Sequence, residues 1–169
     1  MVFQHSVIPV FRDKKMDAKN SKIIGVIGQG RDCSTELLKD AEQVGYHIAQ
    51  KNAILICGGL GGVMEAACRG AKNGSGTTIG VIPTAQKSDA NKFVDIPIVT
   101  GLGEARNIII VRSADALIAV GGKYGTLSEI AFALSFGKPI VGLRTWQNLG
   151  QVIHVESPEQ AVETVFKFI

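Results

Sequence analysis

The chain has 169 residues, of which 46% are hydrophobic and 20% are charged, and this composition is typical of one globular domain with a sizeable core. Its formal net charge of +3 is too small, and its Lys and Arg residues are too scattered, for a nucleic-acid-binding surface. It has no long apolar run and no start like a signal peptide, so we expect a soluble cytoplasmic protein without a membrane partner.

Short apolar runs alternate with segments of helical period from Lys22 onward, which is typical of repeated βαβ units. The expected strands cover residues 23–27, 53–57, 77–82, 96–99, 116–120, 140–143 and 152–155. We therefore predict an α/β fold, a single-domain doubly wound (Rossmann-like) sheet of about six or seven mostly parallel strands. Residues 1–20 are expected to form an N-terminal arm or edge strand, and residues 21–169 the Rossmann-like nucleotide- or phosphate-binding domain.

The helices are expected between these strands, and two of them have clear start signals. Asp32 is the expected N-cap of the first helix. Ser157, followed by Pro158 and by Gln160 at the third helical position, predicts a capping box at the start of the last helix. The other helices are expected near residues 62–73, 103–113 and 126–136.

Three glycine-rich loops, at residues 28–31, 58–62 and 121–126, each join an expected strand to the following helix. All lie at the carboxyl edge of the sheet, where folds of this type bind ligands. Glycine allows close backbone approach, and the free amides of a helix N-terminus attract phosphate. The predicted ligand-binding residues are Gly28, Gly30, Gly58, Gly59, Gly61, Gly62, Gly121, Gly122, Gly125 and Thr126. The alternative is that the glycines serve packing alone, in a structural or oligomerisation module without a ligand.

The common phosphate and metal motifs fit this chain poorly. The first loop, GQGRDC, lacks the third glycine of the dinucleotide fingerprint, and the second strand ends in Cys57 and Gly58 instead of an acidic residue. The GKP sequence at residues 137–139 is not a Walker loop. The three cysteines and three histidines show no metal-ligand spacing, so we expect reduced structural thiols and no metal site.

Residues 116–143, which read ALIAVGGKYGTLSEIAFALSFGKPIVGL, and the upstream segment LICGGLGGVMEAACRGA together resemble the superfamily labelled "possible lysine decarboxylase". This superfamily includes the LONELY GUY phosphoribohydrolases and the molybdenum cofactor carrier proteins. The likeness covers about residues 22–145. It places the family's PGGxGTxxE-type motif on Gly121, Gly122, Gly125, Thr126 and Glu129, and the motif's upstream Arg on Arg106.

Two positions depart from the phosphoribohydrolase pattern. Val120 stands where those enzymes have Pro, and Asn107 stands where they have Lys. The GEARN and VGG sequences resemble the cofactor-carrier branch more closely. The resemblance therefore implies a binding or carrier protein for a phosphorylated, nucleotide-like ligand or the molybdenum cofactor, with no further cofactor required. The alternative it leaves open is a phosphoribohydrolase that cleaves the N-glycosidic bond of a nucleoside 5′-monophosphate.

In the phosphoribohydrolase alternative, Glu129 and Arg106 are the catalytic residues. The Glu129 carboxylate would stabilise positive charge at the ribose C1 or orient the attacking water. Arg106 would hold the phosphate or polarise the leaving base. Two simpler interpretations compete: Thr126 and Glu129 form a capping box, and Arg106 forms a surface ion pair with Glu104 or Asp115.

The apolar residues at 108–111 surround their expected helix on all sides, and a sheet can cover only one of these sides. Residues 130–136 add a second apolar surface of the same kind. We therefore expect a homodimer or a homotetramer.

Overall fold

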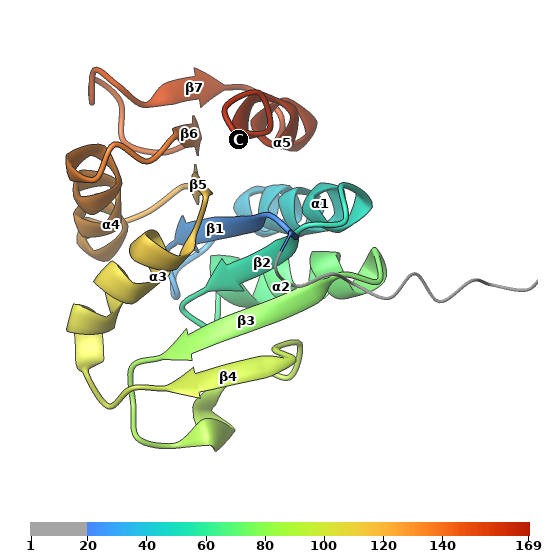
Figure 1. Ribbon diagram of the computed structural model, residues 1–169, viewed down its shortest axis with the longest axis vertical. Helices are drawn as coiled ribbons and strands as arrows, with labels where there is room; N and C mark the ends of the chain where they lie inside the picture. The colour runs from blue at the N-terminus through green and yellow to red at the C-terminus, as the bar shows by residue number, and fades with distance from the viewer. Residues whose placement is uncertain (1–19) are drawn as a thin grey trace, which may run out of the picture.

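The computed structural model describes residues 20–169, so the arm or edge strand expected over residues 1–20 lies outside the described residues except for its last position. The strands are β1 (Ile23–Gly28), β2 (Ile54–Cys57), β3 (Thr77–Ile82), β4 (Ile96–Val99), β5 (Ala116–Val120), β6 (Ile140–Leu143) and β7 (Ile153–Val155). They form one parallel sheet in the order β4-β3-β2-β1-β5-β6-β7 (Figure 1). This confirms the predicted doubly wound parallel sheet.

The helices cover both faces of the sheet. The helical segments are α1 (Thr35–Gln50), α2 (Val63–Asn73), the short 3-10 turn η1 (Lys87–Asp89), the 3-10 turn η2 (Gly103–Arg106), α3 (Asn107–Ser113), α4 (Tyr124–Ser135) and α5 (Pro158–Val165). Figure 1 shows α1, α2 and α5 on one face and α3 and α4 on the other. Each face has its own apolar core, and the alternation of strand side chains supplies both: Ile118 belongs to the first core and Leu117 to the second.

Two helix starts differ from the prediction. Helix α1 is capped by Ser34, whose hydroxyl accepts a hydrogen bond from the helix, while Asp32 lies two residues earlier with a positive φ of 55°. Asp32 is therefore not the N-cap. At α5, Ser157 Oγ accepts from the backbone N–H of Gln160, but Gln160 Oε1 accepts from Glu156 instead of from Ser157. The predicted capping box is thus only half formed.

Helices α1 and α2 cross at two glycines. A Cβ atom on Gly45 would overlap the carbonyl oxygen of Ala67, and a Cβ atom on Gly70 would overlap the carbonyl oxygen of Glu42. The two backbones are therefore in direct contact at this crossing. Glycine inside a helix costs about 1 kcal/mol of stability relative to alanine, so its presence needs a reason. The close approach of the two backbones supplies that reason for both glycines.

Two further properties concern the described residues as a whole. From residue 20 to residue 169, no helix combines the length and the apolar character needed to cross a membrane. The cysteines in this part of the chain are free, as expected. Two of them, Cys57 at the end of β2 and Cys68 on α2, are buried with their Sγ atoms 3.5 Å apart.

Candidate functional site

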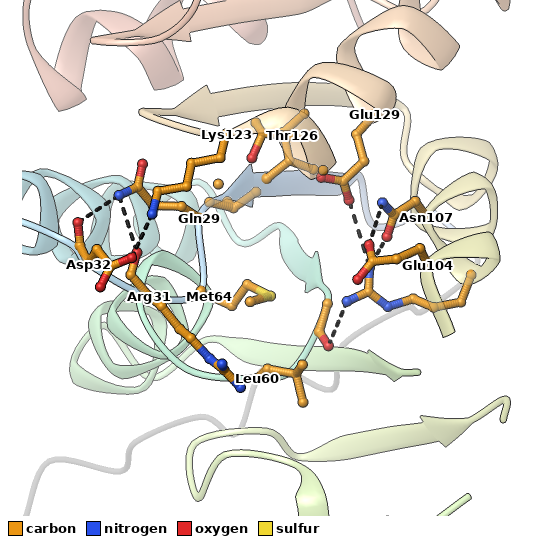
Figure 2. A pocket seen from close by; sticks show the side chains of 17 residues that line it. Gln29, Arg31, Asp32, Leu60, Met64, Glu104, Asn107, Lys123, Thr126 and Glu129 are labelled. Carbon is orange, nitrogen blue, oxygen red and sulfur yellow. Dashed lines mark hydrogen bonds and ion pairs between the residues drawn. The ribbon is translucent and has the colours of Figure 1, made fainter. Parts of the chain in front are cut away.

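A pocket of about 400 Å³ opens at the carboxyl edge of the sheet. It lies between the loops that follow three strands: the β1 loop (residues 29–34), the β2 loop (residues 58–62) and the β5 loop (residues 121–123) (Figure 2). Its volume falls within the range of about 300 to 1,000 Å³ that is usual for small-molecule sites. The predicted site residues that line it are Gly28, Gly30, Gly58, Arg106, Gly125, Thr126 and Glu129.

Some of the predicted ligand-binding glycines do not line this pocket, namely Gly59, Gly61, Gly62, Gly121 and Gly122. Gly62 has a φ of 64°, and a Cβ atom there would lie 2.5 Å from the carbonyl oxygen of Gln29. Gly59 has a φ of 71° and packs against the side chain of Ile82 on β3. Glycine is required at these two positions by backbone conformation and packing, which the packing interpretation of the loops anticipates.

Arg106 is the last residue of η2, directly before α3, and is only 6% exposed. One nitrogen of its guanidinium donates to the Gly58 carbonyl oxygen at 3.4 Å, and another donates to Asn107 Oδ1. The guanidinium also lies 3.9 Å from Glu129 Oε1. Its Nε atom is buried and has no hydrogen-bond partner among the described residues. This N–H is therefore a polar group that the fold itself leaves unsatisfied, which is costly in a protein interior.

The interpretation of Arg106 as a partner in a surface ion pair with Glu104 or Asp115 is therefore wrong, because Arg106 is buried and binds other groups. Asp115, between α3 and β5, accepts a hydrogen bond from the backbone N–H of Ile23 at 2.8 Å, which ties this connection to β1. Glu104 accepts from the side chain of Asn107 at 3.5 Å. The helix expected over residues 103–113 is divided into η2 and α3 at Arg106, the point where its side chain enters the pocket.

Glu129 lies in the second turn of α4 and is 6% exposed. Because α4 begins at Tyr124 and has no side-chain cap, Thr126 is inside the first turn and the capping-box interpretation is wrong. Burial raises the pKa of Glu129 to about 8, and the opposing effect of the Arg106 charge is smaller. The raised pKa favours the uncharged carboxylic acid at neutral pH, a form that donates a hydrogen bond as well as accepting one.

This shift makes the stability of the protein depend on pH. Glu129 has an unperturbed pKa of 4.5 and a folded pKa of about 8, so its contribution to stability is complete below pH 4.5 and is lost as the pH rises through 8. Glu129→Gln cannot ionise. We therefore expect its free energy of unfolding, relative to that of wild type, to be higher by a few kcal/mol at about pH 9 than at about pH 5, since one pKa unit corresponds to about 1.4 kcal/mol. Urea unfolding at both pH values measures this difference.

The control for that experiment is Glu159→Gln, which removes an exposed carboxylate from the first turn of α5. Its free energy of unfolding should track that of wild type across the same pH range. A Glu129→Gln variant whose stability difference from wild type is the same at both pH values would show that Glu129 ionises normally in the folded protein.

On the opposite side of the pocket, the β1 loop is bridged to the β5 loop. Gln29 Oε1 accepts from the backbone N–H of Gly122 at 3.1 Å, and Gln29 Nε2 donates to the carbonyl oxygen of Asp32 at 2.9 Å. Lys123 Nζ lies 2.6 Å from Asp32 Oδ2, and this ammonium group lowers the pKa of the Asp32 carboxyl. Figure 2 shows Gln29, Asp32 and Lys123 on this side and Glu129 on the other.

Between the two sides, Leu60 and Met64 give the pocket an apolar wall (Figure 2). Sequence reasoning missed both residues, and it also missed Gln29 and Asp32 as pocket residues. The available signal was their position, since Gln29 and Leu60 stand between predicted ligand-binding glycines and Met64 lies just after such a loop. Within residues 20–169, no cluster of three or more His, Cys, Asp or Glu residues could hold a metal ion.

Two aromatic residues flank the β5 loop. Trp146 Nε1 donates to the carbonyl oxygen of Lys123 at 3.4 Å, and its ring lies 5.8 Å from the ring of Tyr124. Tyr124 is 80% exposed. Tyr124, which directly follows the pocket residue Lys123, is thus an exposed ring with the half-buried Trp146 beside it.

Residues 21–167 match the model of the SLOG cluster4 family. The molybdenum cofactor binding protein of Rippkaea orientalis is 42% identical, with a TM-score of 0.83 over 87% of this chain and 96% of that one. The molybdenum cofactor carrier protein of Chlamydomonas reinhardtii is 40% identical, with a TM-score of 0.79 over 88% of this chain and 98% of that one. A cytokinin riboside 5′-monophosphate phosphoribohydrolase of Mycobacterium tuberculosis is 33% identical in an alignment of 153 positions that covers 79% of this chain and 81% of the enzyme.

Proposed function

Because this chain belongs to the SLOG cluster4 family and shares its fold with molybdenum cofactor carrier proteins, we propose that it binds and carries a ligand of that kind without cleaving it. The ligand is the molybdenum cofactor or another phosphorylated, nucleotide-like molecule. The observation that carries the proposal is the 40 to 42% identity, over 87 to 88% of this chain, to binding and carrier proteins for that cofactor. The burial of Glu129 beside Arg106 supports it, because the raised pKa of this carboxyl favours the uncharged acid, which can hold a polar ring by hydrogen bonds.

The chemistry of the pocket is compatible with the molybdenum cofactor. That cofactor combines a phosphate monoester with a fused ring system rich in hydrogen-bonding groups, and it brings its own metal. Lys123 and Arg31 supply positive charge for the phosphate on one side of the pocket. On the other side, Arg106 and Glu129 line the pocket, and an uncharged Glu129 carboxyl offers both a donor and an acceptor to a ring edge. The apolar wall of Leu60 and Met64 suits the face of such a ring.

The second candidate function is that of a phosphoribohydrolase acting on a nucleoside 5′-monophosphate. It is favoured by the meeting of Arg106 and Glu129 in one pocket, 3.9 Å apart, since these are the groups that such an enzyme would need. In this case Glu129 would act as a carboxylate. Because the pKa of Glu129 is raised to about 8, turnover would then increase as the pH rises through that value.

One experiment separates the two functions. The purified protein is incubated with nucleoside 5′-monophosphates at about pH 7 and about pH 9, and released base and ribose 5-phosphate are measured by chromatography. In parallel it is mixed with molybdenum cofactor, and co-elution of the pterin is followed by gel filtration. A carrier retains the pterin in stoichiometric amount and releases no more base than Glu129→Gln does. Release of base that Glu129→Gln abolishes would establish the hydrolase instead. If the protein neither retains the pterin nor releases base, a structural module without a ligand is the interpretation that remains.

We further propose that the protein is a homodimer or homotetramer. On α3, Ile108 and Ile109 are only half-buried. The rings of Phe132 on α4 and of Phe136, directly after that helix, stack at 5.9 Å and are also half-buried. Both helices cover the same face of the sheet, so a second copy could bury all four side chains together. Light scattering that gives the mass of a monomer at micromolar concentration would contradict this prediction.

A further inference from the structure

Two groups of the β5 loop that are suited to bind an anion are already engaged by the β1 loop. The backbone N–H of Gly122 donates to Gln29 Oε1 at 3.1 Å, and the ammonium of Lys123 lies 2.6 Å from Asp32 Oδ2. Both groups stand at the start of α4, where backbone amides and the helix dipole favour negative charge. The β1 loop thus presents one neutral acceptor and one carboxylate to the groups that would otherwise hold a phosphate.

The backbone around Gln29 fixes the direction of its side chain. Its carbonyl oxygen accepts from Val63 N at 3.0 Å, at the start of α2, and its Nε2 donates to the carbonyl oxygens of Arg31 and Asp32. Gly122 is fixed as well, because it has a φ of 125° and a Cβ atom there would lie 2.5 Å from Thr126. The contact between the Gln29 side chain and the Gly122 amide therefore joins two positions whose backbones are held in place.

We propose that Gln29 Oε1 and the Asp32 carboxylate are internal substitutes for the oxygens of the ligand's phosphate monoester, and that the ligand displaces both when it binds. This inference rests on the proposed binding function and explains how the same site would favour a phosphorylated ligand over an uncharged one. The two contacts reproduce what a phosphate makes at a helix N-terminus, a backbone N–H bond and a charge-assisted bond to Lys. An uncharged ligand cannot replace the carboxylate on Lys123, whereas a phosphate dianion can.

A second observation places the rest of the ligand in the same pocket. Arg106 is 6% exposed, lines the pocket and keeps its Nε without a partner among the described residues. Leu60 and Met64 line the same pocket, so a molecule with its phosphate at Gly122 and Lys123 would share it with them and with Arg106. The site thus contains an occupied anion position on one side and the buried Arg106 side chain on the other.

The direction of a mutational effect distinguishes this role from ordinary ligand contact. If Gln29 and Asp32 held the ligand directly, removing them would weaken binding. If they compete with its phosphate, removing them strengthens binding. The Lys123 and Asp32 side chains are 59% and 78% exposed, so the gain is modest: about threefold for each single change and about tenfold for both together.

The test uses adenosine 5′-monophosphate and adenosine, which differ only by the phosphate, as titrants in calorimetry. Wild type is compared with Gln29→Ala, Asp32→Asn and the double variant. Asp40→Asn is the matched control, since Asp40 forms an equally short ion pair with Arg144, 2.6 Å, on α1 away from the pocket. We expect the dissociation constant for the monophosphate to fall in the three β1-loop variants and to stay at the wild-type value in the control, with adenosine unaffected.

Each other outcome contradicts the inference. If wild type binds the monophosphate and the variants bind it equally or more weakly, the competition does not exist, while the proposed function stands. If adenosine binding is strengthened to the same extent, the effect is not on a phosphate position. If neither wild type nor any variant binds the monophosphate, the inference and the proposed binding of nucleotide-like phosphates fail together. Asp32→Asn changes an exposed side chain, so a fold defect in Gln29→Ala does not prevent the test.

Discussion

Arg106→Ala is expected to weaken ligand binding by about 100-fold, because a buried charge-assisted hydrogen bond is worth about 2 to 3 kcal/mol. The side chain is buried and lines the pocket, and its hydrogen bonds to Gly58 and Asn107 hold the guanidinium in a fixed position from which it can meet the ligand. Arg106→Lys should recover little of this loss, since one ammonium cannot reach Gly58, Asn107 and a ligand at once as the guanidinium fork can.

The matched control for Arg106 is Arg112→Ala. Arg112 is an exposed arginine at the end of α3, and its guanidinium lies over the ring of Phe136, 3.9 Å from the centroid. Removing it changes the net charge by the same amount without touching the pocket. Calorimetric titration of the ligand measures both variants. Arg106→Ala with an affinity within about threefold of wild type would mean that Arg106 serves the fold and not the ligand.

Gly70→Ala is expected to destabilise the protein by about 3 kcal/mol or more, because the added methyl group meets the backbone of α1 at Glu42 and neither backbone can give way locally. Gly45→Ala should have a similar effect from the other side of the crossing, at Ala67. The sign of the stability change is informative. Alanine is the better helix former by about 1 kcal/mol, so both variants would be more stable than wild type if the two helices left space at the crossing. A loss of this size lowers the melting temperature of a domain of this length by about 10 °C.

Gly150→Ala is the control for these two variants, because nothing lies within 4 Å of its added methyl group and its φ is not positive. Its melting temperature should stay close to that of wild type. Differential scanning calorimetry compares the three variants. A Gly70→Ala protein that melts at or above the wild-type temperature would show that α1 and α2 are not in backbone contact in solution.

The strands are the part of the fold that the sequence predicts best. The bounds predicted at residues 77–82, 96–99, 116–120 and 140–143 coincide with β3, β4, β5 and β6. Each is a short apolar run between turn residues, and a parallel sheet buried on both faces produces that pattern directly. The glycine crossing of α1 and α2 could not be predicted, because it depends on which surfaces of two helices meet in space.

Helix starts were harder to predict because several residues nearby have the right chemistry. Asp32 and Ser34 are both good N-cap residues; the structure uses Ser34, while the Asp32 carboxylate binds Lys123, which lies far away in the sequence. The site, too, was predicted only in part. The motif identifies Arg106 and Glu129, but the raised pKa of Glu129 comes from burial, which no local pattern reveals.

The hydrogen bond from Trp146 to Lys123 gives the protein a built-in optical probe. Trp146 is the single tryptophan of the chain, and its indole N–H binds the carbonyl oxygen of the residue that follows Gly122. Indole emission is sensitive to the polarity and hydrogen bonding around the ring. Because its partner carbonyl belongs to the residue that forms the ion pair with Asp32, a ligand that rearranges this ion pair perturbs the light the protein emits. Occupancy of the pocket can thus be followed in the unlabelled protein, in real time and without radioactive or fluorescent tracers.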